Sequence, residues 1–129
     1  MARSENVTLL LEPLNTKVDH PGYTLSSSRQ AFEIVRRIGN PNLKVLYDVY
    51  HMQIMEGDLI ATMAANLADI GHIHVADVPG RHEPGTGEIN YVNIARMLQE
   101  AKYDGSIGLE CFPRDSSEAA IDAFRIVFS

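Results

Sequence analysis

Four residues that can bind a metal ion or move a proton recur along the chain at similar intervals. They are two glutamates, an aspartate and a histidine: Glu12, Asp48, His74 and Glu110. The intervals between successive members are 36, 26 and 36 residues. Three carboxylates brought close together repel one another, and one of them takes up a proton unless a cation neutralises the group. Three oxygen ligands and one imidazole suit Mn²⁺, Mg²⁺ or Co²⁺ better than a thiolate-type zinc site.

The same residues have a simpler interpretation when each is considered alone. An acidic side chain at the end of a strand often caps the next helix or faces water. Four such positions in successive units are harder to explain by solvation, so the regular spacing favours a shared site.

Two further residues are candidates for substrate binding. His51 follows Asp48 by three residues and could donate a hydrogen bond to a substrate oxygen, although its spacing fits a surface-loop histidine equally well. Arg81 lies on a polar stretch, residues 79–90, and could hold an anionic or hydroxyl-rich substrate with its planar guanidinium. On spacing alone, an ordinary exposed arginine is the simpler interpretation. Gly85 and Gly87 are typical of turns, and no complete phosphate-binding loop pattern is present.

The elements that must position these residues are strands and helices in alternation, and the spacing of apolar residues distinguishes the two. Short apolar runs predict strands at residues 7–11, 44–48, 72–76 and 106–110, and the first run reads as a strand covered on both faces. Apolar residues at helical spacing follow each run, within residues 31–38, 60–67, 94–101 and 120–127.

Residues with capping preferences mark the expected helix boundaries. Ser27 and Gln30 form the pattern of a capping box, and Asp58 and Asp115 can begin later helices. Gly71 is expected to end the helix that Asp58 begins.

Four consecutive βα units predict an α/β fold with a parallel sheet, in a single domain spanning residues 1–129. The carboxyl ends of parallel strands lie on one edge of the sheet, where ligands bind. If the sheet curls as in a (β/α)₈ barrel, the four candidate ligands converge.

Composition limits the classes of partner. The chain has 129 residues, of which 45% are hydrophobic and 22% are charged, and this is ordinary globular composition. A net charge of −6 disfavours a nucleic-acid partner, which needs a basic surface. There is no apolar run long enough to cross a membrane, and the first residues do not read as a secretion signal. A single cysteine, Cys111, excludes an internal disulfide and fits the reducing cytoplasm.

Five segments together resemble one family. They are LEPLN at 11–15, YDVYHM at 47–52, HIHVAD at 72–77, PGRHEPGTGEINY at 79–91 and GLE at 108–110. In this order they resemble the hydroxypyruvate isomerases of the xylose isomerase-like barrel superfamily. The resemblance covers nearly the whole chain and corresponds to the C-terminal half of such a barrel, strands five to eight.

The resemblance implies a role for each candidate residue. In related ketose 3-epimerases the metal is held at the positions that match Glu12, Asp48, His74 and Glu110. The two glutamates there also exchange protons with substrate carbon, and the residues that match His51 and Arg81 touch substrate oxygens. Arg81 follows His74 by seven residues instead of the six found in the epimerases, a spacing that sides with the hydroxypyruvate isomerase branch.

The implied activity is an aldose–ketose isomerisation through an enediolate, for example of hydroxypyruvate to tartronate semialdehyde. Three alternatives remain open: a ketose epimerase, a dehydratase acting on a cyclic polyol, and a half-barrel that keeps the fold without activity.

The chain length raises a separate expectation. A complete barrel needs about 250 residues, and four strands leave two sheet edges open to pairing. We therefore expect the chain to form a homo-oligomer or to pair with a missing N-terminal half.

Overall fold

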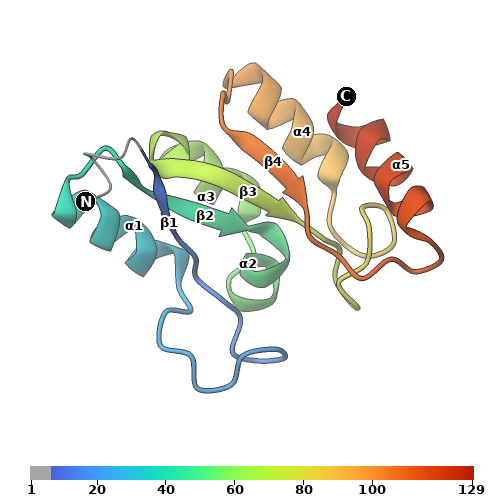
Figure 1. The fold of residues 1–129 in the computed structure, drawn as a ribbon, viewed down its shortest axis with the longest axis horizontal. Helices are drawn as coiled ribbons and strands as arrows, with labels where there is room; N and C mark the ends of the chain where they lie inside the picture. The colour runs from blue at the N-terminus through green and yellow to red at the C-terminus, as the bar shows by residue number, and fades with distance from the viewer. Residues whose placement is uncertain (1–6) are drawn as a thin grey trace.

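A computed structural model describes residues 7–129 as one four-stranded parallel sheet with helices packed along it (Figure 1). The strands are β1 (Leu9–Leu11), β2 (Leu43–Asp48), β3 (Ile70–Val75) and β4 (Ser106–Leu109). The helices are α1 (Ser28–Ile38), α2 (Val49–Met55), α3 (Leu59–Asn66), α4 (Tyr91–Glu100) and α5 (Ser117–Phe128), with a short 3₁₀ helix at Leu67–Asp69. The strands lie in chain order, β1-β2-β3-β4. This confirms the predicted α/β fold of four βα units.

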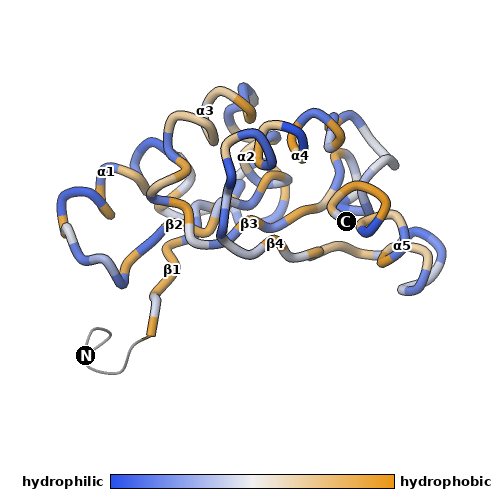
Figure 2. Tube along the Cα trace, turned by 90° about the horizontal axis from the view of Figure 1, so that it is seen from above, coloured by the Kyte–Doolittle hydropathy of each residue, from blue (hydrophilic) through white to orange (hydrophobic). Residues whose placement is uncertain are grey.

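The helices α1 to α4 gather along one face of the sheet, as Figure 2 shows. The core lies between this helical layer and the sheet. From the strands it takes Val45, Tyr47, Ile73 and Val75, and it is completed mainly by residues of α1, α3 and α4, such as Phe32, Met63 and Ile94. Alternate residues of a strand point to opposite faces. The residues between these core positions therefore face the side of the sheet away from α1 to α4.

The first strand differs from the expectation. It spans Leu9–Leu11 instead of residues 7–11, and Leu9 and Leu10 are 55% and 40% exposed. Burial on both faces was therefore wrong for β1 within the described part of the chain. The reason is its position at the edge of the sheet, where it has only β2 as a neighbour.

One helix was not predicted. The helix α2 begins directly after β2, where Asp48 caps it by accepting a hydrogen bond from the backbone N–H of His51 at 3.0 Å. The interpretation of His51 as a loop residue was therefore wrong. A helix of seven residues carries too little apolar periodicity to be read from sequence.

The predicted helix starts are confirmed at α1 and α3, where Ser27 and Asp58 are the N-cap residues, but the start predicted at Asp115 was wrong. Ser27 makes no side-chain capping hydrogen bond, and α1 is capped instead by Glu56, which accepts from the backbone N–H and the hydroxyl of Ser28. Asp58 precedes α3 without a side-chain cap, and Ser116, not Asp115, caps α5. Gly71 lies inside β3, next to an irregularity in its pairing with β2, and does not end a helix.

None of the helices that the structure describes is both long and apolar enough to cross a membrane. The first six residues, on which the reading of a secretion signal partly depends, lie outside the described residues.

Candidate active site

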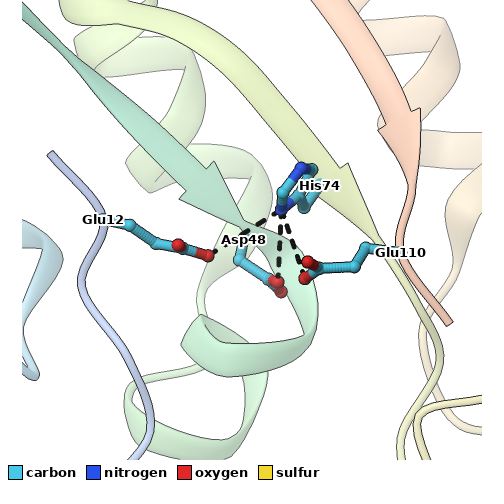
Figure 3. A group of neighbouring side chains, drawn as sticks. All are labelled: Glu12, Asp48, His74 and Glu110. Atoms are coloured by element: carbon cyan, nitrogen blue, oxygen red, sulfur yellow. Dashed lines mark ion pairs between the residues drawn. The ribbon is translucent and has the colours of Figure 1, made fainter. Parts of the chain in front are cut away.

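The four predicted ligands meet at the carboxyl edge of the sheet. One ligand atom from each of Glu12, Asp48, His74 and Glu110 lies within 4.8 Å of all the others. Figure 3 shows the three carboxylates directed toward the imidazole. The Nδ1 atom of His74 is 3.3 Å from Oε2 of Glu110, 3.8 Å from Oε1 of Glu12 and 3.9 Å from Oδ2 of Asp48. The structure therefore brings the predicted cluster together.

Each candidate ligand has its place because of the strand that carries it. Asp48 is the last residue of β2, and His74 stands between the core residues Ile73 and Val75 of β3. Glu12 and Glu110 directly follow β1 and β4. Residues two apart on a strand share a face, so all four ligands project from the face opposite the helical core.

The electrostatics of the cluster suit a cation. Asp48 is 1% exposed, and burial, opposed by the neighbouring Arg81, raises the pKa of its carboxyl to about 6. The carboxylates around His74, Glu12 first, raise the pKa of its imidazole above the ordinary value, against the effect of burial. The buried Nδ1 of His74 has no hydrogen-bond partner. An unpartnered imidazole nitrogen facing three carboxylates is the donor set of a hard or borderline divalent ion.

Arg81 joins this cluster, so the interpretation as an ordinary exposed arginine was wrong. Its Nη2 atom lies 2.5 Å from Oε2 of Glu110 and 3.4 Å from Oδ2 of Asp48. The guanidinium also stands over the ring of Tyr50, 5.0 Å from the centroid. The long loop after β3 therefore places a positive charge directly beside two of the candidate ligands.

His51 is fully buried on α2, which contradicts the alternative of a surface-loop histidine. Its Nε2 atom is 3.4 Å from Nη2 of Arg81 and 3.8 Å from Oδ2 of Asp48. Burial first, and the charge of Arg81 second, lower the pKa of His51 to about 4. The ring is therefore neutral near pH 7 and carries one N–H.

Two buried polar residues near the site were missed from the sequence. Asn15 contacts His51 with its side-chain amide at 2.6 Å. Asp77 accepts hydrogen bonds from the backbone N–H groups of Val78, Gly85 and Ile89, and so fixes the loop that carries Arg81. A signal for both was available, since each is a polar residue placed shortly after a strand.

Several other polar or glycine residues of the same strands and loops lie outside the cluster. His72 and His82 are partly buried and bind Ser106 and the carbonyl of Phe112, respectively. Gly85 adopts a positive φ of 89°, as expected of a turn. Cys111 is partly exposed.

Comparison with known proteins identifies the family. The family model described as "Xylose isomerase-like TIM barrel" matches residues 1–127. The chain belongs to this family. It is 44% identical over 121 residues to hydroxypyruvate isomerase of Escherichia coli, an alignment that covers 94% of this chain and 46% of that protein. It is 43% identical over 120 residues to 2-oxo-tetronate isomerase of Cupriavidus necator, with 93% and 46% covered.

Solved structures agree with this family assignment. A protein described as AP endonuclease family 2, from Brucella melitensis, superposes with a TM-score of 0.90 at 37% identity, covering 96% of this chain and 48% of that one. A 3-keto-D-glucoside 4-epimerase from E. coli superposes with a TM-score of 0.85 at 26% identity, covering 98% and 47%. These matches confirm the family resemblance that the sequence motifs indicated. The chain spans about half the length of the relatives that it matches.

Proposed function

We propose that this site isomerises a small hydroxy acid or sugar of the aldose–ketose type, with Glu12 and Glu110 as acid and base. The observation that carries the proposal is the position of these glutamates. They come from the two edge strands and approach the same His74 nitrogen, at 3.8 and 3.3 Å. The names of the relatives, hydroxypyruvate isomerase and 2-oxo-tetronate isomerase, support this class of substrate.

The reaction needs only two proton-transfer groups. One glutamate removes the proton from the carbon that bears the hydroxyl, and the electron pair of that C–H bond moves to the neighbouring carbonyl. The enediolate that results has one oxygen on each carbon. The other glutamate then delivers a proton to the former carbonyl carbon, while the hydroxyl proton passes to the other oxygen. Atoms and electrons balance without an oxidant or a reductant.

A divalent cation fits the cluster formed by Glu12, Asp48, His74 and Glu110, and we propose these residues as its ligands. When bound there, such an ion supplies Lewis-acid stabilisation of negative charge on substrate oxygens. Without it, the three carboxylates must share protons or rely on Arg81 for neutralisation. The donor set favours Mn²⁺, Mg²⁺ or Co²⁺.

His51 and Arg81 bind the substrate in this proposal. Both are donors at the rim of the cluster, and their nearest nitrogen atoms are 3.4 Å apart. Two donors at this spacing can donate hydrogen bonds to a single oxygen or to the two oxygens of a carboxylate. This arrangement suits a substrate that is anionic or that becomes anionic during the reaction.

The activity is proposed for the site in its assembled barrel. β1 and β4 each have one strand neighbour within the described residues, so further strands can pair with both. Either a second copy of this chain or a missing N-terminal half could supply them, and the cytoplasm remains the expected compartment. Light scattering coupled to size-exclusion chromatography tests the homo-oligomer, and a single species with the mass of one chain would contradict it.

The function is tested by metal analysis together with a substrate panel. The purified protein, supplied with Mn²⁺, is incubated in D₂O with hydroxypyruvate or with 2-oxo-tetronate, and products are identified by NMR. The isomerase proposal expects bound divalent metal, an isomeric product and deuterium on the carbon next to the carbonyl. Inverted configuration with an unchanged carbonyl position would indicate an epimerase, and loss of water would indicate a dehydratase. Absence of both metal and turnover would favour the inactive half-barrel.

A further inference from the structure

Asn15 has a side-chain orientation that its neighbours determine completely. It is fully buried, three residues after Glu12. Its Oδ1 atom accepts hydrogen bonds from the backbone N–H groups of Val18 and Asp19, each at 3.0 Å. Backbone N–H groups are donors only, so the carbonyl oxygen of the amide must face them. The Nδ2 atom therefore points the opposite way.

The amide nitrogen of Asn15 in turn determines the protonation of His51. Nδ2 carries two hydrogens and lies 2.6 Å from Oδ2 of Asp19 and 2.6 Å from Nδ1 of His51. An amide N–H can only donate, so Nδ1 must be the acceptor. A neutral imidazole with an accepting Nδ1 has its proton on Nε2.

The Nε2–H that results has no acceptor among the residues the structure describes. Its nearest polar neighbours are Nη2 of Arg81 at 3.4 Å and Oδ2 of Asp48 at 3.8 Å, which is beyond hydrogen-bond reach. Arg81 is also a donor and by itself would favour an accepting Nε2, but its contact is much longer than the 2.6 Å between Asn15 and Nδ1, so the Asn15 contact decides the tautomer. A buried N–H without a partner costs free energy. The position beside the cluster, where substrate must bind, offers the missing acceptor.

We propose that Asn15 is a positioning residue that holds His51 as the Nε2–H tautomer. In this form His51 and Arg81 make a donor pair for one oxygen of the substrate, the oxygen on which negative charge develops. The substrate class is a 2-oxo acid or hydroxy-carbonyl compound with such an oxygen beside the reacting carbons. The kinetic part of this inference rests on the proposed isomerase function, whereas the tautomer does not.

The tautomer can be measured without substrate. The full chain is labelled with ¹⁵N on histidine, and the two ring nitrogens are distinguished by their chemical shifts and couplings to ring protons. His51→Gln identifies the signals that belong to His51. We expect a protonated Nε2 and an unprotonated Nδ1 near pH 7. A protonated Nδ1 in the wild-type protein would overturn the proposal, whatever the activity.

In Asn15→Asp the new carboxylate requires Nδ1 of His51 to donate instead of to accept, and it keeps an oxygen for the backbone N–H groups of residues 18 and 19. A carboxylate can only accept, so we expect the proton to appear on Nδ1. The value of kcat should fall by about tenfold or more, as when the orienting partner of a functional histidine is removed, with a smaller change in KM. Asn15→Gln should restore part of the activity if its longer amide reaches Nδ1.

Asp19→Asn is the matched control. It changes the other partner of the Asn15 amide and leaves the contact with His51 in place, so tautomer and kcat should both stay unchanged. If Asn15→Asp moves the proton without lowering kcat, the donor-pair role is wrong. If the wild-type protein has the expected tautomer but isomerises nothing, the proposed function fails and the structural role of Asn15 stands. If Asn15→Asp fails to fold, the wild-type spectrum still decides which tautomer is present. The kinetics of Asn15→Gln then decide whether Asn15 positions His51.

Discussion

Nη2 of Arg81 lies 2.5 Å from Oε2 of Glu110, so an internal cation already sits against a candidate metal ligand. The same Nη2 is 3.4 Å from Oδ2 of Asp48. Arg81 has only a small exposed fraction, and its charge is therefore weakly screened. A metal ion bound by the cluster would share two carboxylates with this guanidinium, and the two positive charges would repel each other. In the proposed function Arg81 would therefore have two opposing effects: it would help to bind substrate and would weaken the binding of a divalent cation.

Replacing Arg81 by Met should separate these effects. A guanidinium and a divalent ion that contact the same carboxylates would repel each other by about 2 kcal/mol or more, so Arg81→Met should tighten Mn²⁺ binding by about tenfold or more. The same variant should raise KM because a substrate donor is lost. Titration calorimetry with Mn²⁺ measures the affinity. Arg36→Met is the control, since Arg36 pairs with Asp69 at 2.7 Å in the helical layer. Unchanged or weaker Mn²⁺ binding in Arg81→Met would contradict the competition.

The two glutamates should differ in solvent exchange. If Glu110 removes the substrate proton, Glu110→Gln abolishes exchange of the substrate hydrogen with D₂O, whereas Glu12→Gln slows product formation and still allows exchange. Each variant should lose about 10²- to 10⁴-fold in kcat. NMR of the substrate pool in D₂O measures exchange and turnover together. Glu118→Gln, at the exposed start of α5, is the control. Full exchange in Glu110→Gln would remove Glu110 as the base.

In the metal-free protein, ionisation of the buried Asp48 should lower the free energy of unfolding at neutral pH. Burial raises the pKa of its carboxyl to about 6, above the ordinary value of about 3.9 expected for the unfolded chain. The folded state therefore holds this proton more tightly, and the free energy of unfolding falls as pH rises from about 4 to 6. The loss is complete above pH 6 and amounts to about 2–3 kcal/mol at most.

Asp48→Asn removes this pH-dependent cost and keeps the side-chain oxygen that caps α2. With a chelator present, the variant should be more stable than the wild-type protein at pH 8, and the difference should shrink toward pH 4.5. Urea denaturation at both pH values measures it. Equal destabilisation of Asp48→Asn at the two pH values would show that burial of the charge is not the cause. The same variant should lose Mn²⁺ binding.

The sequence predicted the βα order and the four converging ligands because both depend on strand alternation and strand ends. His74, for example, stands between two core residues, and that pattern is visible in the chain itself. In contrast, the cap of α1 comes from Glu56, 28 residues after the Ser28 that it binds. A contact between segments so far apart in sequence has no local signature, whereas the nearby Ser27 marked the start of the helix correctly without supplying the side-chain hydrogen bond.

Spacing alone gave the wrong environment for Arg81 for a related reason, although the family resemblance had placed it in the site. Its side chain reaches Glu110 only because its loop folds back across the ends of β3 and β4, where Asp77 pairs with His82. Neither the spacing from His74 nor the polar composition of residues 79–90 shows that path. The same holds for His51. It lies on a short helix that directs its side chain toward the site, and a loop at this position could have directed it elsewhere.

Asp77 should control the loop without touching substrate. Its buried carboxylate accepts three backbone N–H groups across residues 78–89, at 2.9–3.0 Å. In Asp77→Asn one acceptor oxygen becomes a donor amide facing a backbone N–H, and a buried mismatch of this kind costs about 1–3 kcal/mol. We expect faster amide hydrogen exchange over residues 78–89 and a raised KM, because Arg81 loses its fixed position. Asp115→Asn, at an exposed position before α5, should change neither measurement. A normal KM despite a loosened loop would show that Arg81 finds its place through Glu110 and Tyr50 alone.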